Sequence, residues 1–237
     1  MATVPEIILA MREAAPAGHQ DLGGTAISEL QSLTQALMSA MPDAEEECRH
    51  FAAIRERRVG VRDHELQAWL CGKSVLVTGG TGCVGAALMA EIALRGPQRL
   101  VSVSRGLTGG WPRIAAAEYL RADITDRTSL AAVLSQVRPD VVFHLAAQRD
   151  PGLAEREVQR TVATNVFGTR NVVELCTEFG AADVICASTG KALRPYSREV
   201  YTAAKRAAEW ILARGATRTN SRLSAVRFTH VVDNSII

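Results

Sequence analysis

The chain has 237 residues, of which 47% are apolar and 22% are charged. At about 150 residues per domain this length predicts one or two domains, and the apolar content excludes an intrinsically disordered protein. The 27 Lys and Arg residues nearly balance the 25 Asp and Glu residues, which argues against a nucleic-acid or membrane-surface binder that works by bulk charge. No apolar run reaches the roughly 18 residues of a membrane helix, and the first residues lack the basic start of a signal peptide. These features predict a soluble, cytoplasmic protein.

The cysteines and histidines carry no recognisable site pattern. There are five of each, they are scattered along the chain, and no two cysteines form a C-x-x-C pair. The sequence therefore predicts neither a disulfide framework nor a bound metal.

Residues 1–70 are predicted to form a helical N-terminal segment. Apolar residues recur at helical spacing over 7–11 and again over 27–41. A third helix is expected to begin near Asp43, where acidic residues suit the positive end of a helix dipole. The arginine-rich stretch 55–62 is interpreted as a solvated face, with a partner-binding surface as the alternative.

Residues 71–237 show short β-branched runs that alternate with helical stretches. The predicted strands cover 74–78, 99–104, 118–123, 140–146, 182–188 and 221–228. The predicted helices cover 84–95, 126–137, about 154–179 and 199–213. This alternation predicts an α/β fold with a doubly wound parallel sheet, Rossmann-like and covered by helices on both faces. Such a sheet binds its ligand beyond the carboxyl ends of the strands.

The stretch TGGTGCVG at 78–85 lies between the first predicted strand and an apolar helix. In a dinucleotide-binding turn Gly79 permits the tight turn, Gly82 lets the backbone approach a pyrophosphate, and Gly85 allows close packing of helix on strand. The N-terminus of the following helix offers free N–H groups and a positive dipole to the phosphates. The strand-to-helix context therefore favours dinucleotide binding over a purely structural turn.

The end of the second predicted strand bears on the choice of cofactor. It reads Ser104-Arg105, where an acidic residue would accept hydrogen bonds from the ribose 2′-hydroxyl of NAD. A guanidinium pairs with a 2′-phosphate, whereas a carboxylate repels it. The sequence therefore favours NADP over NAD. The alternative is that Arg105 covers the adenine or points to solvent.

The ends of the third and fourth strands are expected to line the same cofactor. Asp123 and Ile124 follow the third strand and are placed to address adenine with a carboxylate and a backbone amide. Ala146 and Ala147 follow the fourth, where ribose and nicotinamide must pass close to the backbone. His144, within that apolar strand, is interpreted as a packed residue and not as an acid or base.

The candidate catalytic pair is Tyr201 and Lys205. Their four-residue spacing puts both on one face of a predicted helix. We expect the ammonium to lower the pKa of the tyrosine and so prepare it for proton transfer. Thr189 or Ser188, at the end of the preceding strand, is expected to hold the substrate oxygen, and Lys205 to bond the nicotinamide ribose as well.

Residues 73 to about 234 resemble extended short-chain dehydrogenases/reductases through a series of motifs in order: VLVTGGTGCVG, VSVSR, ADITD, FHLAAQR, TNVFGTRNV, ASTGKALRP, Y-x-x-x-K and VRFTHVV. The chain is most similar to the polysaccharide-biosynthesis branch, which holds UDP-N-acetylglucosamine 4,6-dehydratases and related epimerases/dehydratases. The resemblance implies cofactor contacts from Gly79, Thr81, Gly82, Cys83, Val84, Gly85, Ser104, Arg105, Asp123, Ile124, Ala146, Ala147 and Lys205. It implies catalytic roles for Tyr201, Lys205, Thr189 and Lys191. It also matches Arg149 and Asn165 to a basic residue and an asparagine of the family.

The chain departs from this branch at several positions. The usual S-T-D-K reads S-T-G-K at 188–191, so Gly190 replaces the aspartate proposed as the acid for water loss, while Lys191 remains as a candidate base for the C5 proton. Asp150 stands where the branch has a histidine, and Asp-Asn-Ser at 233–235 replaces a loop with glycine and arginine. The family's C-terminal substrate subdomain is predicted to be absent or truncated, since the sequence ends soon after the sixth strand.

The expected function is NADP-dependent modification of a nucleotide-linked sugar, of the epimerase or dehydratase type. The expected assembly is a homo-oligomer, with no nucleic-acid or membrane partner. Two alternatives stay open. One is an NADPH-dependent reductase of a non-sugar ketone, which needs only Tyr201, Lys205 and Thr189. The other is a nucleotide-binding interaction protein in which residues 1–70 are the functional part.

Overall fold

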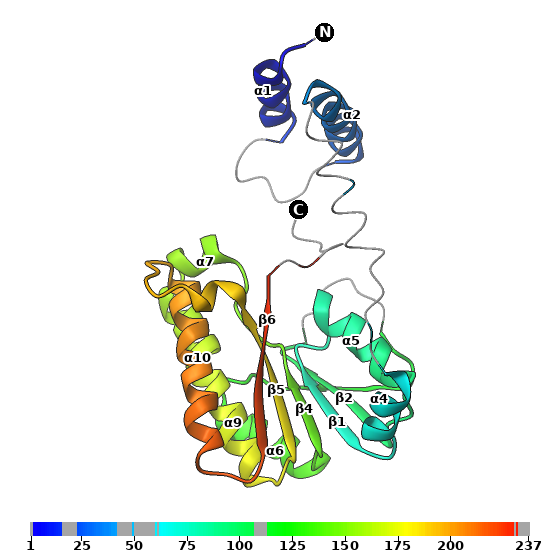
Figure 1. Ribbon diagram of the computed structural model, residues 1–237, viewed down its shortest axis with the longest axis vertical. Helices are drawn as coiled ribbons and strands as arrows, with labels where there is room; N and C mark the ends of the chain where they lie inside the picture. The colour runs from blue at the N-terminus through cyan, green and yellow to red at the C-terminus, as the bar shows by residue number, and fades with distance from the viewer. Residues whose placement is uncertain are drawn as a thin grey trace. The chain divides into compact units, whose positions relative to one another are not determined.

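The computed structural model describes residues 2–15, 23–41, 62–106 and 113–229, together with residues 49, 60 and 231 (Figure 1). The chain forms two compact units, Met1–Gly60 and Val61–Ile237. Each unit is described by itself below.

The first unit contains two helices that pack on each other, α1 (Val4–Ala14) and α2 (Gly24–Ala40). Helix α1 begins at a capping box, in which the Thr3 backbone N–H and hydroxyl both donate to the Glu6 carboxylate. Ile7 is its buried residue. The helix predicted near Asp43 and most of the arginine-rich stretch lie outside the described residues.

The second unit is built on a six-stranded sheet in which every pair of neighbouring strands is parallel. The strands are β1 (Ser74–Thr78), β2 (Arg99–Ser104), β3 (Glu118–Arg121), β4 (Val141–His144), β5 (Asp183–Thr189) and β6 (Arg222–Phe228). Their order is β3-β2-β1-β4-β5-β6, so the winding reverses between β1 and β4. The predicted fold class, a Rossmann-like doubly wound parallel sheet, is confirmed.

Helices cover the two faces of this sheet. They are α4 (Asp63–Leu70), α5 (Cys83–Ala93), α6 (Arg127–Val137), α7 (Pro151–Arg156), α8 (Val158–Val162), the π-helical η1 (Ala163–Gly168), α9 (Thr169–Glu178), the 3-10 helix η2 (Gly190–Leu193) and α10 (Val200–Ala216). Strand β1 sends Leu76 into a core with α6, α9 and α10, and its neighbours Val75 and Val77 into a second core with α4 and α5. This alternation follows from the two-residue period of a strand.

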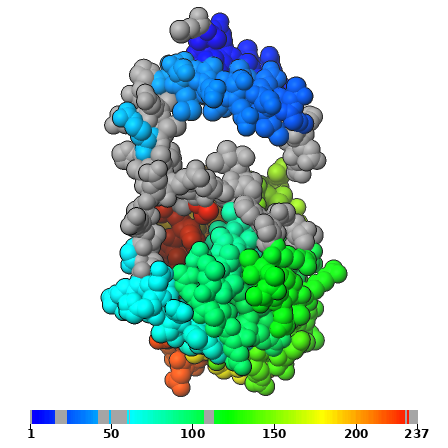
Figure 2. Space-filling view, turned by 90° about the vertical axis from the view of Figure 1, so that its right-hand side faces the viewer, coloured from blue at the N-terminus to red at the C-terminus, as the bar shows by residue number. Residues whose placement is uncertain are grey.

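The structure differs from the sequence predictions at three places. The single helix predicted near 154–179 is divided into α7, α8, η1 and α9, because the chain leaves helical geometry at Glu157 and widens to a π-helix at 163–168. Helix α4 was not predicted, although its last residue, Leu70, is buried in the second core. Strand β6 is mostly exposed and not covered on both faces, since it is the edge strand; Figure 2 shows part of it in red at the surface.

No helix in the part of the chain that the structure describes combines the length and apolar character that a membrane crossing needs. Within the same ranges, no three His, Cys, Asp or Glu side chains gather as a candidate metal site. The cysteines among the described residues, Cys71, Cys83, Cys176 and Cys186, are free thiols.

Candidate functional site

The glycine loop after β1 forms the turn that its sequence predicts. Gly79 has a φ of +75°, which favours glycine, and a Cβ there would lie 2.8 Å from the Ala146 backbone nitrogen. A Cβ at Gly85, in the first turn of α5, would overlap the Gly79 carbonyl oxygen. These two glycines are therefore required by the turn and by the close contact of helix and strand.

Gly82 has a different environment. A Cβ at this position would make only an ordinary contact of 3.4 Å with the Gly79 carbonyl oxygen, so the packing of the chain does not demand a glycine. Gly82 is the N-cap of α5 and, as a glycine, has no side chain to cap this helix end. The loop thus leaves space beside Gly82 at the N-terminus of an 11-residue helix, whose first N–H groups are available to a ligand. This arrangement fits a pyrophosphate. Thr81, Cys83 and Val84 lie in the same loop and first turn, all half-buried.

The end of β2 presents Ser104, followed by the exposed Arg105. Gly106 then turns the chain with a φ of +88°, and its N–H donates to the Ser104 hydroxyl at 3.4 Å. Among the described residues, the Arg105 side chain has no ion pair. A free guanidinium therefore stands where the sequence predicts contact with a ribose phosphate.

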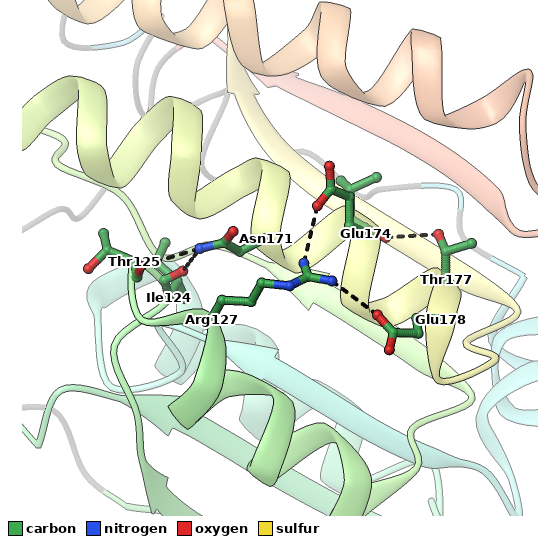
Figure 3. Close-up of polar contacts among 8 residues, drawn as sticks. Ile124, Thr125, Arg127, Asn171, Glu174, Thr177 and Glu178 are labelled. Atoms are coloured by element: carbon green, nitrogen blue, oxygen red, sulfur yellow. Dashed lines mark hydrogen bonds and ion pairs between the residues drawn. The ribbon is translucent and has the colours of Figure 1, made fainter.

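The turn after β3 is held by its own side chains and by α9. The Asp123 carboxylate accepts from the backbone N–H and the hydroxyl of Thr125, at 2.9 and 2.8 Å. Figure 3 shows Asn171 of α9 donating to the carbonyl oxygens of Ile124 and Thr125, at 3.0 and 3.3 Å. The Ile124 side chain is buried against Gly168, so it is the backbone of Ile124 that remains for an adenine ring.

Helix α6 is tied to α9 beside this turn. Arg127, the first residue of α6, donates to the carboxylates of Glu174 and Glu178 at 3.1 Å each (Figure 3). These ion pairs are about half exposed, so each stabilises the fold by at most about 1 kcal/mol. Their geometric effect is to align the two helices that frame the 123–125 turn.

A buried chain of hydrogen bonds lies beneath Ala146. The Thr78 hydroxyl and His144 Nδ1 are 2.7 Å apart, and His144 Nε2 is 3.0 Å from the Thr169 hydroxyl. Thr169 donates to the Asn165 carbonyl oxygen at 2.8 Å, so Nε2 must carry the ring proton and Nδ1 must accept. Burial, with a smaller contribution from the Lys205 charge, lowers the pKa of His144 to about 3. The prediction that His144 is a packed residue agrees with this neutral, fully bonded ring.

Asn165 fixes the segment that follows β4. Its side-chain oxygen accepts from the Gln148 N–H at 2.8 Å and its amide donates to the Gln148 carbonyl at 2.9 Å. The π-helix η1 turns this buried asparagine toward the 145–148 segment. The half-buried Ala146 and Ala147 thus lie on a rigid stretch beside the glycine loop. Asp150 caps α7 by accepting from the Leu153 N–H at 2.7 Å.

Tyr201 and Lys205 both lie in the first two turns of α10, near the end of β5. Burial raises the pKa of Tyr201 and lowers the pKa of Lys205 to about 8. The Lys205 ammonium donates to the Ala187 carbonyl oxygen at 2.9 Å. The expectation that Lys205 lowers the tyrosine pKa is therefore wrong for the chain alone, because desolvation of the phenol dominates and the ammonium is directed at β5.

The two candidate hydroxyls at the end of β5 differ in their partners. Ser188 is buried and donates to the Glu209 carboxylate at 2.5 Å. Arg227 of β6 holds the same carboxylate through two hydrogen bonds of 2.9 and 2.7 Å. Thr189 is half-buried, and its hydroxyl oxygen accepts from the Lys191 N–H at 3.3 Å, which leaves the hydroxyl proton for another acceptor. Of the two, Thr189 is the one whose hydroxyl proton is not committed to a carboxylate within the described residues.

Lys191 lies in η2 and pairs with a carboxylate that follows later in the sequence. Its ammonium is 3.2 Å from Glu199, which also accepts from the Thr202 hydroxyl at 2.7 Å. The bonds from Thr202 and Lys191 lower the pKa of Glu199. Arg206 of α10 holds the same loop by donating to the carbonyl oxygens of Ala192 and Pro195.

Gly190 is not held by backbone strain. Its φ lies outside the left-handed region, and the nearest atom to a Cβ built there is the Thr229 methyl, at 3.1 Å. A side chain at this position therefore does not require a strained backbone. A larger residue needs only a small displacement of a threonine methyl.

Several residues that support the site could not be identified from the sequence. The sequence shows only that polar residues occur at otherwise apolar positions of strands and helices. It does not show which of these side chains form hydrogen bonds with one another. These residues are Thr78, Thr169, Gln148, Arg206 and Glu209.

A family model described as "Polysaccharide biosynthesis protein" matches residues 75–236. Over 178 residues the chain is 29% identical to a probable polysaccharide biosynthesis protein EpsC of Bacillus subtilis. The alignment covers 71% of this chain and 29% of that protein. Over 171 residues it is 29% identical to a UDP-N-acetylglucosamine 4,6-dehydratase (inverting) of Campylobacter jejuni, covering 68% of this chain and 50% of the relative. The chain thus spans half or less of the length of these relatives.

Solved structures with similar folds point to the same group of proteins. A UDP-glucose 4-epimerase from Thermotoga maritima, solved with UDP-glucose, matches with a TM-score of 0.60 and 25% identity, covering 65% of this chain and 54% of that one. MoeE5, in complex with UDP-glucose and NAD, matches with a TM-score of 0.57 and 27% identity over the same shares of the two chains. The resemblance drawn from the sequence motifs is confirmed.

Proposed function

Since the chain belongs to the polysaccharide biosynthesis protein family, we propose that its second unit binds NADP and carries out oxidation and reduction at a hydroxyl-bearing carbon of a nucleotide-linked sugar. The observation that carries the proposal is the position of two groups at the carboxyl edge of one sheet. The glycine loop follows β1, and the Tyr201–Lys205 pair follows β5, on the two sides of the point where the strand order reverses. Ligands of open α/β sheets bind at such a point.

The proposed cofactor is a nicotinamide dinucleotide. MoeE5, a structural neighbour, is described with NAD bound, which supports the cofactor class and leaves the phosphate form to this chain's own residues. Gly79, Gly82 and the N-terminus of α5 would hold the pyrophosphate, and the 123–125 turn the adenine. The exposed Arg105 and the lack of a carboxylate at the end of β2 favour NADP over NAD.

The bound dinucleotide supplies the hydride acceptor and donor for such a reaction. Tyr201 takes the proton from the sugar hydroxyl during oxidation and returns it during reduction. Because burial raises its pKa, the phenol is protonated in the free chain and is ready to donate. Lys205, with a pKa of about 8, is mostly charged at pH 7, and we assign its ammonium to the nicotinamide ribose. Thr189 would hold the substrate oxygen.

The proposal favours oxidation–reduction or epimerisation over 4,6-dehydration. Loss of water needs a proton donor, and Gly190 provides none. Glu199, the carboxylate beside Lys191, has a lowered pKa and is ionised at neutral pH, so it is not a ready donor either. Lys191, the candidate base at C5, is engaged in an ion pair with Glu199.

The test is turnover by the full chain with a panel of UDP-sugars and NADP, followed by NADPH fluorescence. We expect reduction of NADP with a UDP-sugar, and loss of that signal in Tyr201→Phe with NADPH binding retained. The same assay with NADPH and simple ketones tests the alternative of a non-sugar reductase. NADPH binding with no turnover of any compound would instead favour a nucleotide-binding interaction protein.

The proposed assembly is a homo-oligomer that pairs through α10 and η1. Trp210 of α10 is 66% exposed and Phe167 of η1 is 48% exposed, and these two helices pack side by side. Large apolar side chains at the surface are typical of interfaces. Light scattering of wild type and Trp210→Ser tests the proposal, since the variant is expected to shift toward monomer. The domain boundary at 70/71 and the cytoplasmic location remain predictions.

A further inference from the structure

A second arginine lies beside the end of β2. Arg121 is the last residue of β3 and pairs in register with Ser104, the last residue of β2. The Arg121 side chain runs along Gly106: a Cβ built on that glycine would be 3.5 Å from Arg121 Cδ and 3.6 Å from Nε. Arg121 therefore lies next to the turn that carries Arg105, although the two are 16 positions apart in the sequence.

Both strands present these residues on the face that carries the glycine loop. On β2, Ser102 and Ser104 share a face, and Ser102 lies directly under Gly80, where a Cβ would be 2.5 Å from its hydroxyl oxygen. On β3, Tyr119 and Arg121 share a face, and Tyr119 packs against the core that contains α5. The side chains of Ser104 and Arg121 therefore leave the sheet on the side of α5 and the glycine loop.

Neighbouring acidic groups do not neutralise this pair of arginines. Glu118, on the same strand as Arg121, is held by Arg99 through two hydrogen bonds of 2.8 Å. Asp123 accepts from Thr125 within its own turn. Within the described ranges, neither Arg105 nor Arg121 has an ion pair, and both are exposed. Two free guanidiniums thus flank the Ser104–Gly106 turn.

We propose that Arg121 is a specificity-determining residue, which binds the 2′-phosphate of NADP together with Arg105 and Ser104. The inference rests on the proposed function and names a contact that the sequence motifs do not. A phosphate group carries up to two negative charges, and two guanidiniums with fixed fork geometry match it better than one. The 2′-hydroxyl of NAD offers no charge to either, so Arg121 discriminates between the two cofactors and adds nothing to NAD binding.

The test is direct binding of NADPH and of NADH, which differ only in the 2′-phosphate, to the full chain by fluorescence titration. The variants are Arg121→Ala, Arg105→Ala and, as a matched control, Arg214→Ala. Arg214 is exposed near the end of α10, at the opposite edge of the sheet from the glycine loop, so its variant removes the same charge at a distance. We expect Arg121→Ala to weaken NADPH binding roughly tenfold or more and to leave NADH binding unchanged.

The possible results separate this inference from the proposal on which it rests. If wild type prefers NADPH, and Arg105→Ala loses the preference while Arg121→Ala keeps it, Arg121 has no role and the NADP proposal stands. If Arg214→Ala weakens NADPH binding as much as Arg121→Ala, the effect is one of net charge and the inference is overturned. If wild type binds the two cofactors equally, or binds neither, both proposals fail. Unchanged NADH binding by Arg121→Ala serves as the check that the variant is folded.

Discussion

The buried histidine of β4 makes the stability of the fold depend on pH in a defined window. His144 is neutral in the folded chain because burial lowers its pKa from 6.5 to about 3. In the unfolded chain the ring recovers its ordinary pKa and takes up a proton as the pH falls below 6.5. The folded state thus binds fewer protons than the unfolded state between pH 6.5 and pH 3, and its stability falls as the pH is lowered through this range.

The magnitude follows from the two pKa values. At pH 5 the unfolded ring is almost fully protonated, 1.5 pH units below its pKa of 6.5, while the folded ring is still neutral. At about 1.4 kcal/mol per unit, the free energy of unfolding is about 2 kcal/mol lower at pH 5 than at pH 7.5. Ion-paired carboxylates such as Asp183 and Glu209, whose pKa values are lowered, lose their contribution only at lower pH, as they become protonated.

Urea unfolding at pH 7.5, 6 and 5, followed by circular dichroism, measures this effect. The comparison is with His144→Gln, whose amide offers one donor and one acceptor to Thr169 and Thr78 but does not titrate. We expect the variant to be less stable than wild type at pH 7.5 and to lose less stability on going to pH 5. Parallel pH dependence in the two proteins would refute the assignment of His144 as a buried neutral ring.

Three further predictions concern the candidate site. Arg105→Ala is expected to weaken NADPH binding roughly tenfold to a hundredfold in a fluorescence titration and to leave NADH binding unchanged. If the variant kept the wild-type preference for NADPH over NADH, the NADP proposal would be contradicted. Wild-type NADPH binding is expected to weaken above pH 8, where Lys205 loses its proton. The Lys205→Met variant should bind NADPH weakly at every pH. It should also unfold at a higher urea concentration than wild type at pH 7, because it buries no charge. Gly190→Asp is expected to increase the loss of water from UDP-N-acetylglucosamine, measured by mass spectrometry. The double variant Gly190→Asp/Thr229→Ser removes the threonine methyl that lies 3.1 Å from a Cβ at position 190, and so tests whether crowding hides the effect.

Most of the fold could be predicted from the sequence because short strand-like runs alternate with helical stretches along residues 74–228. The predicted boundaries of β1 and β2 agree with the structure, and the other four strands agree to within three residues at either end. The helix that follows β4 could not be predicted in detail. Its π-helical turn depends on the bonds of Asn165 to Gln148 and on the packing of Gly168 against Ile124, and neither contact is visible in a helical period.

The candidate site could be predicted where its residues follow one another in the chain. The glycine loop is such a case, because turn, pyrophosphate approach and helix start all lie within eight residues. Contacts made across the fold could not be found this way. Ser188 and Thr189 are adjacent and chemically alike, and only the position of Glu209 on α10 separates their roles. The link between Ser104 and Arg121 likewise depends on strand register.

The buried charge of Lys205 destabilises the folded chain, so a role in ligand binding explains its position better than a role in stability. Lowering its pKa from 10.5 to about 8 corresponds to a cost of about 3 kcal/mol for keeping the charged form buried. Below pH 8 both the folded and unfolded chains carry this proton, so the folded state bears the full cost at pH 7 and is relieved of it only as the pH rises from 8 to 10.5. Glu209, the nearby carboxylate, bonds to Arg227 and Ser188, and within the described residues Lys205 has a carbonyl oxygen as its hydrogen-bond partner. A methionine of similar length would avoid the cost. A buried ammonium four residues after a half-buried tyrosine is thus a destabilising feature at the edge where the strand order predicts a ligand, and a bound anionic cofactor is what would offset it.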